Sequence, residues 1–381
     1  MIPADIGAQL TTILRLAIAA GEFPPAAALP PAGSWRPVPA APGKAAAGCY
    51  GTVLPFALAE VTGRPPAELA ALLAGRLRGA PGIAAAATTG AGHLTVTVTG
   101  EALAALAPRI VAAGPYGAAP DGRARPRTAA APQPDLRAAR SWREAWRWQA
   151  DAVTVRLAAA GQLLNAPGKN TSGAQSSVRP AAAGQPDAVR GPPGHQAPTT
   201  GGAGLGGAPV AAAIEYAGLD AVRYALTRTP ARRAGQAGGR ICVSRDRQNP
   251  FYRVLRAHAD AAGTLRWAAD LRLYPDAPDA MPALALSHPR ERELLTELSW
   301  LPERVAGAAR RRHPHEVAGY LEQLAEIWTR CREDCPALPF GGHAAPADRV
   351  GVAARLCLAD ATRSVLAAGL ALIGVAAPQR L

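Results

Sequence analysis

The chain has 381 residues, 49% of them hydrophobic, and a formal net charge of +13 at pH 7. This length argues against a single small domain and predicts two or three domains with enough residues for a buried core. The positive charge favours a polyanionic partner, because clustered basic side chains release counterions from phosphate groups. The alternative is a coding bias towards arginine, since Lys44 and Lys169 are the only lysines.

The five cysteines are scattered and include no CxxC pair. This pattern argues against a disulfide framework or a zinc ribbon, and Cys331 and Cys335, one helical turn apart, are better explained as core residues than as ligands. We therefore expect no metal and no cofactor. The sequence shows no basic segment followed by an apolar leader and no run of about 18 uninterrupted apolar residues, so we expect a cytoplasmic protein without a membrane partner.

An α+β module is predicted for residues 1–115. Asp5 can cap a first helix, and Pro65-Pro66 can open a second one. Residues 93–99 alternate between apolar and polar side chains, as a half-buried strand does, and residues 101–113 return to a helical pattern.

Residues 165–212 consist mainly of Gly, Pro, Ala, Ser and Thr, with few large apolar side chains. Such a segment cannot offset the entropy lost on ordering, so we predict a flexible linker. After it, residues 213–381 have helical periodicity throughout. One helix is predicted to begin at Asn249-Pro250 and the last at about Asp348, which indicates an all-α bundle.

Residues 249–259, Asn-Pro-Phe-Tyr-Arg-Val-Leu-Arg-Ala-His-Ala, are similar to the start of the DALR anticodon-binding domain of arginyl-tRNA synthetases. Further similar segments follow in the family's order, at residues 293–295, 301–305, 314–321, 324–325 and 370–381, and residues 218–226 resemble the segment that precedes the domain. The resemblance implies a helix bundle that recognises tRNA.

The N-terminal module resembles the additional domain that precedes the catalytic core in the same family. Residues 48–53, Gly-Cys-Tyr-Gly-Thr-Val, occupy the place of a glycine-aspartate-tyrosine segment, and residues 90–94 match a second glycine-containing segment. The resemblance implies contact with the elbow of tRNA. Cys49 and Val53 replace the usual aspartate and asparagine.

The catalytic signatures of a class I synthetase are missing from the chain. Trp142 stands where the glycine of a HIGH motif belongs, and Lys169 is the only lysine near a KMSK-like position. Lys169 also lacks the spacing of a P-loop, and no HExxH or Gly-x-Ser-x-Gly motif occurs. We therefore interpret residues 116–164 as a degenerate remnant of a catalytic domain and expect no enzyme activity.

The resemblance and the Arg-rich helices together suggest a set of tRNA-binding residues. Guanidinium groups suit phosphates and also stack on unpaired bases. The set comprises Arg310, Arg311, Arg312, His315, Trp328, Arg332, Arg355, Arg363, Gln379 and Arg380. For Arg310–Arg312 the alternative is a solvated helix C-terminus, where positive charge is favourable.

The predicted fold is therefore an α+β N-terminal module joined by a degenerate segment and a flexible linker to a DALR anticodon-binding-like helix bundle. The predicted function is tRNA binding by a non-catalytic relative of arginyl-tRNA synthetase. One alternative is a scaffold that has lost RNA binding and pairs with a synthetase or another protein. A second is an arginine–tRNA ligase, which the missing motifs disfavour.

Overall fold

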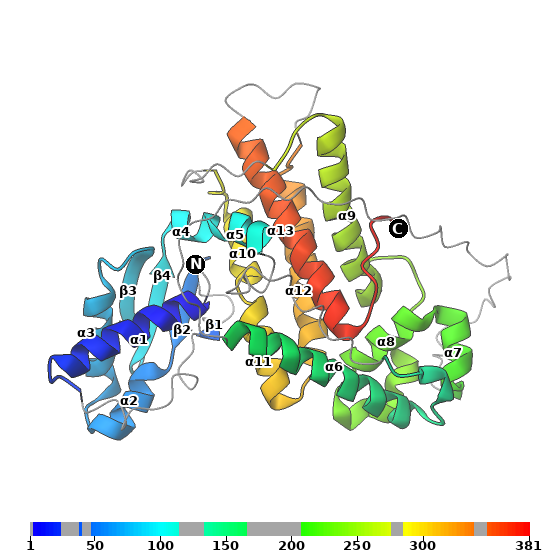
Figure 1. The fold of residues 1–381 in the computed structure, drawn as a ribbon, viewed down its shortest axis with the longest axis horizontal. Coiled ribbons are helices and arrows are strands. Elements are labelled where there is room, and N and C mark those ends of the chain that lie inside the picture. Colours follow the sequence, from blue (N-terminus) through cyan, green and yellow to red (C-terminus); the bar gives the residue numbers. More distant parts are fainter. Residues whose placement is uncertain are drawn as a thin grey trace.

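The computed structural model of the chain describes residues 3–23, 38–39, 47–113, 133–165, 207–275, 285–338 and 349–381. A small α+β module packs against a larger helical body (Figure 1). The predicted fold class, an α+β module followed by an all-α bundle, is confirmed.

The N-terminal module is one antiparallel sheet with helices around it. The strand order is β1-β2-β4-β3, and β4 pairs with both β2 and β3. Side chains of β4 alternate as predicted, with Leu94, Val96 and Val98 buried against the helices. The elements are α1 (Pro3–Ala19), β1 (Val38–Pro39), β2 (Cys49–Thr52), α2 (Leu54–Thr62), α3 (Pro66–Leu77), β3 (Ile83–Thr89), β4 (His93–Val98), α4 (Gly100–Ala104) and α5 (Leu106–Ala113).

Gly92, at the turn between β3 and β4, is a position that requires glycine. Its φ is +123°, a conformation that other residues rarely adopt, and a Cβ there would lie 2.7 Å from Pro66. The glycine therefore lets the β3–β4 turn approach the first residue of α3 closely.

The helical body follows from α6 onward. Asn249 caps α9 as predicted, because its side-chain oxygen accepts hydrogen bonds from the N–H groups of Phe251 and Tyr252. The elements are η2 (Leu136–Ala138), α6 (Trp142–Asn165), α7 (Val210–Ala217), α8 (Leu219–Arg228), η4 (Ala231–Arg240), α9 (Pro250–Asp270), α10 (Pro289–Leu298), α11 (Leu301–Arg311), α12 (His315–Asp334) and α13 (Arg349–Ile373).

The long helix α13 lies in the centre of this body. It is long and apolar enough to cross a membrane, although polar residues interrupt its apolar sequence. However, 67% of its most apolar window is buried inside the protein. This degree of burial is that of a core helix in a bundle.

Helix α6, which falls in the predicted catalytic remnant, belongs to the helical body. Gln149 donates a hydrogen bond to the carbonyl of Ile373 at 2.8 Å, and Arg156 donates to Leu372 at 3.2 Å. Arg223 of α8 donates to Gly374 at 3.2 Å. These donors satisfy the free carbonyls at the C-terminal end of α13, and two of them bring the positive charge that this end favours.

Trp142, at the HIGH position, is a core residue here. Its indole N–H donates to the carbonyl of Ala208 at 3.0 Å, and its ring packs on Gly238 of η4. The rest of the remnant up to residue 132, and residues 166–206 of the predicted linker, lie outside the described residues. Helix α7 begins at Val210, three residues before the predicted start of the bundle.

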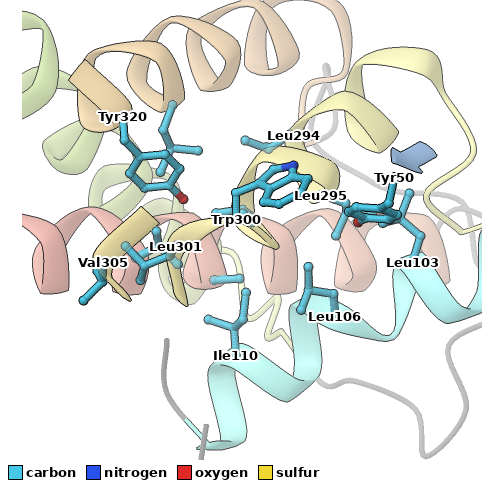
Figure 2. Close-up of a cluster of buried hydrophobic side chains, with 14 of the residues drawn as sticks. Tyr50, Leu103, Leu106, Ile110, Leu294, Leu295, Trp300, Leu301, Val305 and Tyr320 are labelled. Atoms are coloured by element: carbon cyan, nitrogen blue, oxygen red, sulfur yellow. The ribbon is translucent and has the colours of Figure 1, made fainter. Parts of the chain in front are cut away.

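The two modules share one hydrophobic core. Figure 2 shows Tyr50 and residues of α4 and α5 facing Leu295, Trp300 and Leu301. The Tyr50 and Trp300 rings lie 5.4 Å apart, and the Tyr50 hydroxyl shares a 3.0 Å hydrogen bond with Ser299. The N–H of Gly48 donates to the Thr296 hydroxyl at 2.8 Å. The N-terminal module is therefore docked directly on the bundle.

Candidate nucleic-acid interface

Positive charge is exposed at the corner between α11 and α12. Arg310 lies in the last turn of α11, and Arg312 ends that helix in a left-handed conformation with φ 55°. Both side chains are exposed, and neither has a carboxylate partner within the described ranges. Arg311 differs, because its Nε lies 3.0 Å from Oε1 of Glu316 and this pairing lowers the pKa of that carboxyl.

His315 occupies the first position of α12, beside the same corner. Burial lowers its pKa, and the nearby His313 ring and Arg232 lower it further. The two imidazole rings lie 5.1 Å apart. His315 is therefore mainly neutral at pH 7 and can form hydrogen bonds there without adding charge.

A pocket of about 710 Å³ lies at the opposite end of α12, between that helix, α9 and α13. Its lining includes the predicted residues Trp328, Arg332 and Arg355. Trp328 is only 3% exposed, and its indole N–H has no acceptor within the described part of the chain. Trp267 of α9, which the sequence analysis missed, lines the same pocket and is 65% exposed.

The arginines at this pocket are paired with carboxylates. Nε of Arg355 lies 2.7 Å from Oε1 of the buried Glu291, and Arg332 lies 3.5 Å from Asp260. Arg363, farther along α13, is paired with Asp360 at 2.6 Å. These carboxylates offset most of the positive charge of Arg332, Arg355 and Arg363.

The thiols of Cys331 and Cys335 also line this pocket. Burial raises the pKa of both, so they are protonated and weakly nucleophilic at neutral pH. Over the described residues, no group of three His, Cys, Asp or Glu could hold a metal.

The C-terminal tail runs back along α9. The ring of His258 donates from Nδ1 to the carbonyl of Pro378 at 2.9 Å, and Arg266 donates to the carbonyl of Gln379 at 2.8 Å. These bonds fix the main chain and leave the side chains of Gln379 and Arg380 exposed.

The predicted residues thus fall into three places: the α11–α12 corner, the pocket, and the tail with Arg363. Since α12 has 20 residues, its ends are about 30 Å apart. The corner and the pocket are therefore separate features. The signal that could have identified Trp267 is its position among polar neighbours on α9, where a core tryptophan is not expected.

This body is an all-α domain with a basic corner and an aromatic pocket, and residues 254–381 match the DALR anticodon binding domain family. The C-terminal part of the chain is therefore similar to the anticodon-binding domain of arginyl-tRNA synthetases. The predicted resemblance is confirmed over this part.

The chain is 39% identical over 169 residues to an arginine–tRNA ligase of Frankia alni, covering 44% of this chain and 30% of that protein. A ligase of Pseudarthrobacter chlorophenolicus is 39% identical over 171 residues, with the same coverage. The structure of the Thermus thermophilus arginyl-tRNA synthetase is 28% identical, with a TM-score of 0.31, over 45% of this chain and 28% of that one. The chain thus matches less than a third of its curated relatives' length. The resemblance of residues 1–115 stays a prediction.

Proposed function

We propose that the chain binds tRNA through its anticodon-binding-type bundle and does not aminoacylate it. The observation that supports the proposal is the pair of exposed arginines at the α11–α12 corner of this domain, Arg310 and Arg312, which form no salt bridge with any described residue. A guanidinium without a carboxylate partner can neutralise a phosphate without first breaking an ion pair. Arg311 and Arg332 would first have to break an ion pair, because they are paired with Glu316 and Asp260.

Changing Arg310 and Arg312 together to Ala is expected to weaken tRNA binding roughly tenfold at about 0.1 M salt. The slope of log affinity against log salt should fall by about 2, because each phosphate contact contributes about one unit. Total tRNA titrated across a salt series measures both. The matched control is Arg330→Ala, since Arg330 is exposed on α12 but paired with Glu326. If Arg330→Ala weakened binding as much as the double variant, or if binding did not depend on salt, the proposal would be contradicted.

The pocket supports a second contact of the same function, with an unstacked base of a single-stranded loop. Trp267 offers an exposed aromatic face at its rim, and such faces bind bases of any sequence. The indole N–H of Trp328 could meet a base acceptor after a small movement, because it now lacks one among the described residues. We therefore assign base stacking to Trp267, whereas Trp328 forms part of the pocket wall.

Trp267→Ala is expected to weaken binding of an RNA hairpin loop by about 1–3 kcal/mol, the usual value for one stacked base. Trp267→Phe should retain part of the affinity because it keeps an aromatic face. Binding of a blunt RNA duplex should change little with either variant. Fluorescence anisotropy with the two RNAs measures this, and an equal loss for loop and duplex would refute the stacking role.

The absence of aminoacylation is proposed from the missing HIGH and KMSK-like motifs in this sequence. Arginine-dependent ATP–pyrophosphate exchange is expected to be undetectable, and exchange above background would support the ligase alternative. A chain indifferent to tRNA that binds a synthetase would support the scaffold alternative. The inferred place of action is the cytoplasm, where tRNA is used in translation.

A further inference from the structure

We propose that the basic corner continues across η4 and α6 as a strip that holds the phosphate backbone of a tRNA stem. The strip consists of Arg143 and Arg147 on α6 and Arg232 and Arg233 on η4, beside Arg310 and Arg312. Its first four residues precede residues 254–381, the part that matches the anticodon-binding family. The inference rests on the proposed tRNA binding and extends it to a new surface.

The elements of the strip are in direct contact. Helix α6 packs along both α11 and η4, and Figure 1 shows α6 crossing beside α11 at the base of the bundle. Nη2 of Arg143 lies 3.9 Å from the position of a Cβ on Gly235. Arg232 lies close enough to His315 to lower the pKa of that ring. Helix α6 therefore contacts both η4 and α11, and Arg232 of η4 lies near His315 at the α11–α12 corner.

The local sequence of η4 turns its arginines outward. Ala234, Ala237 and Gly238 are buried, whereas Arg232 and Arg233 are exposed. A Cβ on Gly238 would lie 2.5 Å from the Trp142 ring, so only glycine lets η4 lie this close to α6. Trp142 and Gly238 thereby hold the arginines of η4 next to those of α6.

The strip carries little compensating negative charge. Its four new arginines are exposed, and no carboxylate of the described residues forms a salt bridge with any of them. Residues 229–245 contain four arginines and no Asp or Glu. Of the acidic groups on these elements, Glu144 accepts from the N–H of Arg140 and Glu316 is paired with Arg311, whereas the exposed Asp151 follows Arg147 by one helical turn.

This surface fits a phosphate backbone better than bases, because its cations are repeated, while Trp146 and Trp148 beside the α6 arginines are partly buried. Proteins recognise RNA stems mainly by backbone contacts and shape, and unpaired arginines meet this requirement without sequence readout. An aromatic face for bases occurs instead at the distant pocket. The strip therefore suits the phosphate backbone of a stem, whereas the pocket suits an unstacked base.

The test uses two double variants of the full chain, Arg232→Ala with Arg233→Ala and Arg143→Ala with Arg147→Ala. Each is expected to weaken binding of total tRNA roughly tenfold at about 0.1 M salt and to reduce the salt slope by about 2. Replacing the same residues by Lys should restore most of the affinity, since a phosphate contact needs charge more than geometry. The four side chains are exposed, so unchanged melting temperatures should accompany the loss.

The control is Arg330→Ala, an exposed arginine of α12 paired with Glu326. If the strip variants bind tRNA like wild type while Arg310→Ala with Arg312→Ala does not, the strip is refuted and the proposed function stands. If wild type does not bind tRNA at all, the proposed function itself fails. If the strip variants lost binding to an acidic protein but bound tRNA like wild type, the strip would belong to a protein partner and the inference would be overturned.

Discussion

Trp300→Ala is expected to lower the free energy of unfolding by about 3–5 kcal/mol, the usual cost of removing a buried aromatic side chain. Trp300 is 4% exposed and packs between Tyr50 of the sheet and the helices of the bundle, as Figure 2 shows. Its removal leaves a cavity where the two modules meet. We therefore expect the N-terminal module to lose its fixed position before the bundle unfolds.

Urea unfolding followed by circular dichroism measures the loss of stability, and limited proteolysis measures release of the N-terminal module. Trp267→Ala is the matched control, because that tryptophan is 65% exposed and its loss should change stability by about 0.5 kcal/mol or less. Tyr50→Phe removes only the hydroxyl bonded to Ser299 and should cost about 1 kcal/mol. A Trp300 variant as stable as the Trp267 variant would show that the modules do not depend on this contact.

Glu297→Gln is expected to stabilise the protein at pH 8 by on the order of 1–3 kcal/mol and to have little effect at pH 5. Glu297 is 7% exposed on α10, and its Oε1 has no hydrogen-bond partner among the described residues. Its pKa is raised to about 7, mainly by burial; Arg304 opposes the shift and Glu293 adds to it. Gln323 donates to its other oxygen at 3.2 Å.

The sign follows from proton binding. A raised pKa means that the folded state binds more protons than the unfolded state between pH 4.5 and about 7. Wild-type stability should therefore fall as pH rises through this window and stay low above it. Glutamine carries no charge at any pH, so it removes this loss. The exposed Glu101→Gln serves as the control, and a stability difference that is independent of pH would contradict the assignment.

The sequence by itself determined the elements whose signals are local. The Asn-Pro pair set the start of α9, because an asparagine oxygen can cap the N–H groups of the next two residues. The period-two alternation of residues 93–98 set β4, since opposite faces of a strand meet different surroundings. The ordered similar segments from residue 249 onward indicated the anticodon-binding domain, and the family match covers residues 254–381.

Only the tertiary structure decided which candidate side chains are available to a ligand. Arg355 and Glu291 are 64 residues apart in the chain, yet they pair because α13 packs beside α10. Trp328 and Trp267 both lie on long helices, but the first faces the core and the second faces solvent. Helical periodicity indicates which face of a helix is apolar, but not which neighbour covers that face.

The same limit applies to α6 and to the module interface. The sequence predicts only a degenerate remnant for residues 116–164, whereas the contacts of α6 with α11, η4 and the end of α13 make this helix part of the bundle. Tyr50 and Trp300 lie far apart in sequence and carry no local signal for each other. Contacts of this kind depend on the packing of whole elements, because buried side chains are selected by shape and volume across the core.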